Sequence, residues 1–131
     1  MIKFELHTAE REQTLDVTEQ VHQALQATGV AEGWVLVFCP HTTCGITINE
    51  NADPDVTADL LEGLASLVPR KGPWRHREGN SDAHMKASLI GSSVMIPVAD
   101  GDLMLGPWQG VYLCEFDGPR RRYLSVSAVS L

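Results

Sequence analysis

Trp34-Val35-Leu36-Val37-Phe38-Cys39-Pro40-His41-Thr42-Thr43-Cys44-Gly45-Ile46-Thr47-Ile48-Asn49 is the stretch that decides how this chain folds. Its first six residues are apolar and rich in β-forming side chains, which predicts a buried strand. Pro40 ends that strand because proline has no backbone N–H to donate to a sheet. Ile46 and Ile48 then alternate with polar residues, which predicts a second strand. His41 therefore lies just past a strand end, where a rigid scaffold can present it to a cleft.

The rest of the chain predicts more strands than helices. Strands are expected at residues 2–6, 94–98, 103–105, 109–116 and 123–131. Helices are expected at residues 14–28, from Asp53-Pro54 until Pro69, and from about residue 80 through Ile90. In the third helix the side chains expected to face inward are Ala83, Met85, Ala87 and Leu89. Several connections have hairpin length, so we predict a single α+β domain over residues 1–131 with a largely antiparallel sheet and about three helices.

Composition excludes several classes of protein. The longest apolar run, residues 34–39, is too short to cross a bilayer. The first residues alternate apolar and polar side chains and include acids, which is unlike a signal peptide, so we expect a cytoplasmic protein without a membrane partner. The three cysteines show no CxxC spacing, and we expect no disulfide framework.

The net charge of −7 is unevenly distributed along the chain. Residues 1–69 hold two basic and eleven acidic side chains, whereas residues 70–131 hold eight basic and six acidic ones. Such an acidic chain is a poor candidate for binding nucleic acid. The basic clusters at residues 70–77 and 120–122 favour a small anionic ligand such as a phosphate, or are simply solvated loops.

Three of the five histidines, His41, His76 and His84, lie among small or charged residues. Three neutral imidazoles with an open fourth position form a recurrent catalytic zinc site. Their spacings of 35 and 8 residues match no local zinc motif, so any convergence must come from the fold. The alternative is that His76 and His84 are ordinary polar residues of a loop and a helix start.

Other polar residues near these histidines suggest roles around such a site. Glu78 and Asp82 are candidates for additional ligands, for carboxylates that orient an imidazole, or for a general base. Asp82 is equally a candidate helix N-cap. Thr42 and Thr43 can hydrogen-bond an imidazole or a ligand. Gln109, beside Trp108, is a candidate for a pocket wall, although a core or interface tryptophan is as good an interpretation.

Taken in order, several blocks of this sequence resemble the YjbQ-like family, also called UPF0047 and described as a secondary thiamine-phosphate synthase family. The blocks are His41-Thr42-Thr43-Cys44-Gly45-Ile46-Thr47-Ile48-Asn49-Glu50-Asn51-Ala52-Asp53-Pro54-Asp55-Val56, His76-Arg77-Glu78-Gly79-Asn80-Ser81-Asp82-Ala83-His84-Met85-Lys86-Ala87-Ser88-Leu89, Trp108-Gln109-Gly110-Val111 and Cys114-Glu115-Phe116-Asp117-Gly118-Pro119-Arg120. The resemblance implies a β-sandwich-like core, a trimer, and a metal site at the three histidines near a subunit boundary.

The resemblance also implies a reaction that joins a pyrimidine diphosphate to a thiazole phosphate and releases pyrophosphate. That chemistry requires a divalent cation and groups that bind phosphate. The residues expected to bind substrate or phosphate are Thr42, Thr43, Asn80, Lys86, Gln109 and Arg120. Histidine ligands favour a zinc-like ion over magnesium, which suggests that the synthase activity is secondary. The alternatives are a metal-dependent hydrolase-like enzyme and a non-catalytic protein that binds a phosphorylated metabolite.

Overall fold

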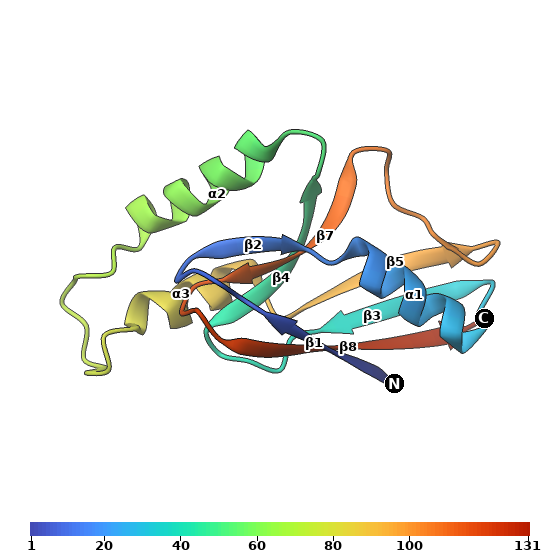
Figure 1. Cartoon of the computed structure of the whole chain (residues 1–131), viewed down its shortest axis with the longest axis horizontal. Coiled ribbons are helices and arrows are strands. Elements are labelled where there is room, and N and C mark those ends of the chain that lie inside the picture. Colours follow the sequence, from blue (N-terminus) through green and yellow to red (C-terminus); the bar gives the residue numbers. More distant parts are fainter.

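The computed structural model describes residues 1–131 and contains eight strands and three helices (Figure 1). The strands are β1 (Ile2–His7), β2 (Gln13–Asp16), β3 (Gly33–Phe38), β4 (Cys44–Glu50), β5 (Ser93–Ala99), β6 (Asp102–Leu103), β7 (Gln109–Glu115) and β8 (Arg121–Ser130). The helices are α1 (Thr18–Thr28), α2 (Pro54–Leu67) and α3 (Ser81–Ile90). The predicted α+β class with three helices is confirmed. No helix is both long enough and apolar enough to span a membrane.

Two antiparallel sheets organise the chain. The larger has the strand order β1-β8-β3-β5-β6, and the smaller has the order β2-β7-β4. The predicted buried strand becomes β3, at the centre of the larger sheet, where Val35 and Val37 are fully buried. The predicted second strand becomes β4, at an edge of the smaller sheet. The loop of residues 40–43 therefore connects the two sheets.

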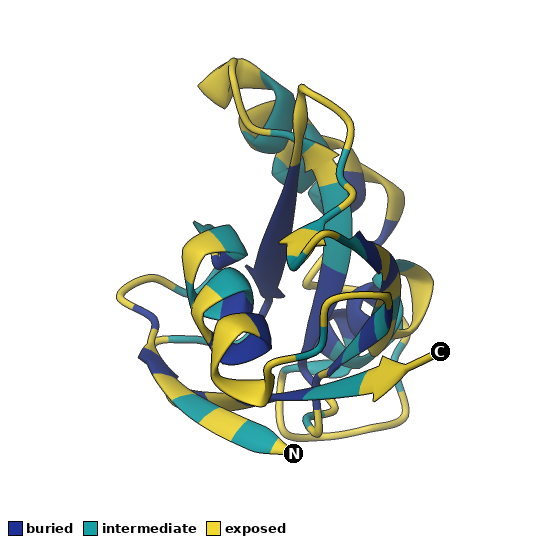
Figure 2. Cartoon of the chain, turned by 90° about the vertical axis from the view of Figure 1, so that its right-hand side faces the viewer, coloured by how far each residue is buried: buried dark blue, intermediate teal, exposed yellow.

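The main core lies between the sheets, and α1 closes it (Figure 2). Val21 and Leu25 of α1 have no exposed surface and pack with the inward side chains of both sheets. Gly29 ends the helix in a left-handed conformation, with φ of 72°, which glycine adopts without steric cost. The predicted stop at this residue is confirmed.

A smaller core lies on the other side of the three-stranded sheet. Its buried members are Leu64, Ala83, Ala87, Tyr112, Cys114 and Phe116. Residues from α2 and α3 thus pack on the outward face of β7, and Figure 1 shows α2 along the upper edge of the molecule. The Asp53 side chain accepts a hydrogen bond from the Asp55 N–H at 2.9 Å, which confirms the predicted start of α2.

Two sequence-based predictions about helices are wrong. Residues 14–16 are not helical but belong to β2, which pairs with β7, because tertiary pairing overrides a helical pattern at this edge. In α3, Leu89 is 59% exposed, whereas Asp82 and Lys86 are fully buried. Ala83 and Ala87 are buried as predicted, but Asp82 and Lys86 take the remaining interior positions in place of Leu89 because the two charges neutralise each other.

Candidate functional site

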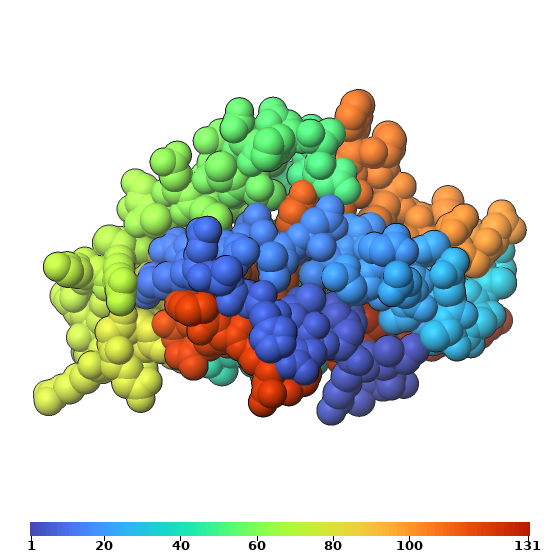
Figure 3. Space-filling view, in the orientation of Figure 1, coloured from blue at the N-terminus to red at the C-terminus, as the bar shows by residue number.

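A polar cavity of about 330 Å³ lies where the 40–43 loop, the start of α3 and the turn between β7 and β8 meet. The residues that line it are Pro40, His41, Thr42, Thr43, Glu78, Asn80, His84, Asp117, Arg120 and Arg122. Seven of them were predicted from the sequence as site residues: His41, Thr42, Thr43, Glu78, Asn80, His84 and Arg120. In Figure 3 the loop of residues 69–80, yellow-green to yellow, forms one end of the molecule and adjoins the red segment that enters β8. The fold thus gathers residues that lie up to 82 positions apart, from Pro40 to Arg122.

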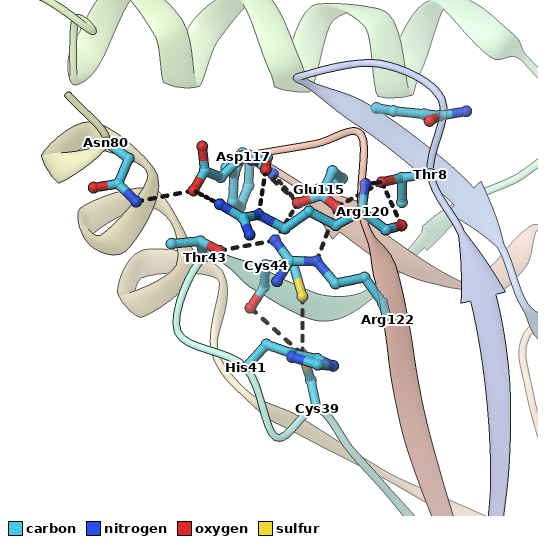
Figure 4. A network of polar contacts seen from close by, with 12 residues as sticks. Thr8, Cys39, His41, Thr43, Cys44, Asn80, Glu115, Asp117, Arg120 and Arg122 are labelled. Carbon is cyan, nitrogen blue, oxygen red and sulfur yellow. Dashed lines mark hydrogen bonds and ion pairs between the residues drawn. The ribbon is translucent and has the colours of Figure 1, made fainter. Parts of the chain in front are cut away.

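A buried ion pair between Arg122 and Glu115 forms the floor of this cavity (Figure 4). Arg122 comes from β8 in the larger sheet and Glu115 from β7 in the smaller one, so the pair joins the two sheets. Arg122 donates from Nε to Glu115 Oε1 at 2.9 Å and from Nη2 to Glu115 Oε2. Its Nη2 also donates to Thr43 Oγ1 at 2.8 Å. The guanidinium is therefore held in one orientation, and its Nη1 takes no part in these bonds.

Five hydrogen bonds keep the Glu115 carboxylate ionised. Besides the two from Arg122, they come from Thr8 Oγ1 at 2.7 Å and from the backbone N–H groups of Phe116 and Asp117, both at 3.1 Å. Burial alone raises the pKa of a carboxyl group, but these donors outweigh it and hold the pKa of Glu115 below its ordinary value.

A second arginine is held in a similar way at the rim of the cavity. Arg120 donates from Nε to the Asp117 carbonyl at 2.8 Å and from Nη2 to Asp117 Oδ2 at 3.0 Å. Asn80 Nδ2 donates to the same oxygen at 2.9 Å. Asn80 Oδ1 is a buried acceptor without a donor in the chain. The rim thus presents a free Nη1 on Arg120 and an unpaired carbonyl on Asn80.

His41 is anchored by the neighbouring strand. Its Nε2 accepts a hydrogen bond from the Tyr123 N–H at 2.9 Å. Burial and the positive charge of Arg122 lower the pKa of His41 below its ordinary value, which favours the neutral ring that this acceptor role requires.

The structure brings His76 and His84 together. Their rings lie edge to face with centroids 5.2 Å apart, and His76 Nε2 lies 3.6 Å from Glu78 Oε2. His41 and His84 also line an adjoining cavity of about 490 Å³ together with Cys44. No group of three or more His, Cys, Asp or Glu side chains is arranged to hold a metal ion. Two of the three predicted ligands are thus neighbours, while Nε2 of the third is engaged with the backbone.

Asp82 and Lys86 lie on the buried side of α3 and do not line the polar cavity. Lys86 Nζ contacts Asp82 Oδ2 at 2.8 Å and Glu12 Oε1 at 3.2 Å, and Arg11 pairs with both Asp82 oxygens at 3.1 and 3.3 Å. Burial opposes ionisation, but these cations hold the pKa of Asp82 below its ordinary value. The structure therefore does not bring Asp82, a predicted base, or Lys86, a predicted phosphate ligand, to the polar cavity, because an interior network of charges holds both side chains.

Gln109 lies at the far end of β7 from Glu115, about 20 Å away along the strand. Its Oε1 accepts a hydrogen bond from the Gly106 N–H at 2.8 Å. The structure therefore does not bring Gln109 to the polar cavity, because it instead closes the turn before β7. Trp108, beside it, is exposed.

Sequence reasoning missed Arg122, Asp117 and Glu115 as parts of this site. A signal for Arg122 exists in the pattern of β8. Arg122 shares its strand face with Leu124 and Val126, which are buried. A charge at a core position of a strand requires a buried partner. The alternation in β8 therefore indicates that Arg122 pairs with a buried carboxylate from another strand.

The fold and the cavity define a two-sheet α+β protein with a polar cavity that contains arginine and histidine side chains. Residues 2–130 match the family model described as "UPF0047 protein YjbQ-like". The UPF0047 protein YugU of Bacillus subtilis is 50% identical over 120 residues, which cover 91% of each chain. The UPF0047 protein MJ1081 of Methanocaldococcus jannaschii is 45% identical over 129 residues, which cover 98% of this chain and 94% of that protein.

Solved structures agree with these sequence matches. A crystal structure of an uncharacterised conserved YjbQ/UPF0047 protein from Clostridium acetobutylicum is 52% identical and has a TM-score of 0.97, covering 98% of this chain and all of that one. The chain therefore belongs to the YjbQ-like UPF0047 family. The family assignment made from the motifs is confirmed.

Proposed function

We propose that this protein is an enzyme that binds phosphorylated metabolites in the polar cavity, with thiamine-phosphate synthesis as a secondary reaction. The observation that carries the proposal is that two arginines are held by the protein in the same way. Arg120 and Arg122 each use Nε and Nη2 on protein acceptors and leave Nη1 for a ligand. Pre-oriented guanidinium groups are strong binders of phosphate because their donors match phosphate oxygens in geometry.

The proposed reaction forms a C–N bond to the thiazole nitrogen and breaks the C–O bond to pyrophosphate. Negative charge grows on the departing oxygen, and fixed donors near that oxygen lower the barrier. Arg120 and Arg122 are the donors available in the cavity, and Thr42 and His84 are further polar groups on its wall. Asn80 Oδ1 is suited to accept an N–H from the pyrimidine, since it is buried and unpaired.

A divalent metal is part of the proposal. A zinc-like ion would be held by His76 and His84, whose rings lie together, with Glu78 beside His76 and with His41 on the wall of the cavity that His84 also lines. For magnesium, Glu78 and Asp117 supply the cavity's carboxylates. Either ion, when bound, would supply positive charge that favours binding of phosphate groups. A metal-dependent hydrolase is the second candidate function, favoured by the His76–His84 contact.

A homotrimer is also proposed, and the outer face of the larger sheet supports it. Large apolar side chains on this face have no covering layer: Phe38 is 42% and Met95 58% exposed. Uncovered apolar patches of this kind mark protein interfaces. A surface hollow on the face is lined by Phe38, Pro40 and Tyr123, and Pro40 also lines the polar cavity. A subunit contact here would therefore border the proposed site.

The test uses purified protein, both phosphorylated substrates and Mg²⁺, with thiamine phosphate measured as product. We expect product from the wild type and from Gln109→Ala, whose side chain lies away from the cavity, and little from Arg120→Ala or His84→Ala. Wild-type product no greater than that of His84→Ala would contradict the synthase proposal. Stabilisation by pyrophosphate without product would instead indicate a binding protein, because a ligand that binds the native state raises its apparent stability.

A further inference from the structure

Two cysteines meet at the point where the larger and smaller sheets are joined. Cys39 follows the last residue of β3, and Cys44 is the first residue of β4. Their Sγ atoms are 3.3 Å apart, and Cys39 Sγ is 3.5 Å from the Cys44 carbonyl oxygen. A disulfide has an S–S length of about 2.05 Å, so the two sulfurs need to approach by only about 1.3 Å. The third cysteine, Cys114, packs in the smaller core on the opposite face of the three-stranded sheet.

One member of the pair, Cys44, lines a cavity, and Cys39 packs behind it in the main core. Both side chains are about 1% exposed, yet Cys44 lines the 490 Å³ cavity beside His41 and His84. Figure 4 shows Cys44 next to the Arg122 guanidinium, with Cys39 directly beyond it. The cavity therefore offers a small oxidant a route to the Cys44 side chain, whose sulfur lies 3.3 Å from the sulfur of Cys39.

We propose that Cys39 and Cys44 form a reversible dithiol–disulfide pair in the wall of this cavity. The proposal goes beyond the proposed enzymatic function and does not depend on it. In a reducing compartment the resting form is the dithiol. Oxidation links the end of β3 to the start of β4 and closes the loop that carries His41, Thr42 and Thr43. The redox state of the pair is thereby coupled to three residues of the polar cavity.

With hydrogen peroxide as the oxidant, the reaction takes two steps. One thiolate attacks a peroxide oxygen, the O–O bond breaks, and the departing hydroxide takes up a proton to become water. The sulfenic acid that results is attacked by the second sulfur, the S–S bond forms and the S–O bond breaks, releasing a second water. Both sulfurs are oxidised and the peroxide is reduced to two waters. A dithiol reductant reverses the change by thiol–disulfide exchange.

The experiment treats the reduced full-length protein with hydrogen peroxide, unfolds it, alkylates the remaining thiols and maps tryptic peptides by mass. The chain has no Lys or Arg between Arg11 and Arg70, so residues 12–70 form one peptide that contains both Cys39 and Cys44. Cys114 falls in the peptide of residues 87–120. We expect the 12–70 peptide to lose two hydrogens and both alkylation sites, Cys114 to remain alkylated, and dithiothreitol to restore all three thiols.

Single-cysteine variants supply the controls. Cys114→Ala should still form the internal disulfide, whereas Cys44→Ala and Cys39→Ala should not, with circular dichroism confirming that each variant is folded. The wild-type peptide map decides the question even if a variant fails to fold. Three alkylatable thiols after oxidation, a sulfinic acid in place of the bond, or a disulfide that joins peptide 12–70 to peptide 87–120 or to a second chain would each overturn the proposal.

Discussion

The two sides of α3 have opposite environments, one buried and the other on the polar cavity. On one side, Asp82 and Lys86 are fully buried and pair with residues of the loop between β1 and β2. On the other side, His84 lines the polar cavity. Residues two apart on a helix point about 200° apart, so a charged run in the sequence divides between interior and cavity. The charges of the interior side stabilise the helix, and the imidazole of the cavity side remains available to a ligand.

The interior side of α3 and the polar cavity each have a buried carboxylate. Asp82 accepts hydrogen bonds from Arg11 and Lys86. Glu115, beneath the cavity, accepts hydrogen bonds from Arg122 and Thr8. Both carboxylates keep depressed pKa values because their donors outweigh the effect of burial. Only the Glu115 network presents a free guanidinium nitrogen to a cavity. Burial and pairing alone therefore do not identify a functional charge.

The largest expected effect is on the interior side. Asp82→Ala removes the carboxylate shared by Arg11 and Lys86 and leaves buried positive charge without its main partner. Removing one partner of a buried ion pair costs about 3–5 kcal/mol of unfolding free energy. Urea denaturation measures the change. His84→Ala, on the cavity side, is the matched control and should cost about 1 kcal/mol or less; equal losses for the two variants would erase the distinction between the sides.

A smaller effect, on ligand binding rather than stability, is expected on the cavity side. Arg120→Ala removes one pre-oriented guanidinium, and a hydrogen bond to a charged group contributes about 1.5–3 kcal/mol. Pyrophosphate affinity, measured by calorimetry, should therefore fall about 10- to 100-fold. Unfolding free energy should change by about 1 kcal/mol at most, because the Arg120 side chain is 53% exposed. Arg121→Ala is the neighbouring control, and an equal loss of affinity there would indicate a non-specific charge effect.

Acid should lower the free energy of unfolding through both the Asp82 network and the Glu115 network. Asp82 and Glu115 have folded-state pKa values below their ordinary values of 3.8 and 4.5. Their contribution to stability is therefore fully present above the unfolded-state values and is lost as the pH falls through the folded-state values. Urea midpoints measured from pH 7 down to about pH 3 should fall mainly below about pH 4.5. Asp82→Asn and Glu115→Gln should each reduce the fall of the urea midpoint at low pH. An unchanged fall in both variants would contradict the assignment of this fall to Asp82 and Glu115.

The sequence was sufficient for every strand except β2, and for the start of α2, the family and most cavity residues. Those predictions depend on local signals, such as the alternation in β4 and the Asp53-Pro54 cap. It was insufficient where partners come from distant strands. Arg122 contacts Glu115 only when both sheets have formed. Lys86 is buried only because Glu12 and Asp82 form ion pairs with it. The pattern of β8 indicates that Arg122 is buried, but it does not identify Glu115 as the partner.

The smallest expected effect tests the corrected orientation of α3. Leu89 looks like a core residue in the sequence but is 59% exposed, so Leu89→Ser should change the unfolding free energy by no more than about 0.5 kcal/mol. Ala83 has no exposed surface, and Ala83→Ile should cost about 1–3 kcal/mol because the added methylenes overfill the contact with β7. Thermal or urea unfolding of the two variants measures this contrast. A larger loss for Leu89→Ser than for Ala83→Ile would mean that Leu89 is buried, as the sequence predicted, and not exposed. In a trimer whose contact covers Leu89, that loss would instead depend on protein concentration, because subunit association would then contribute to stability.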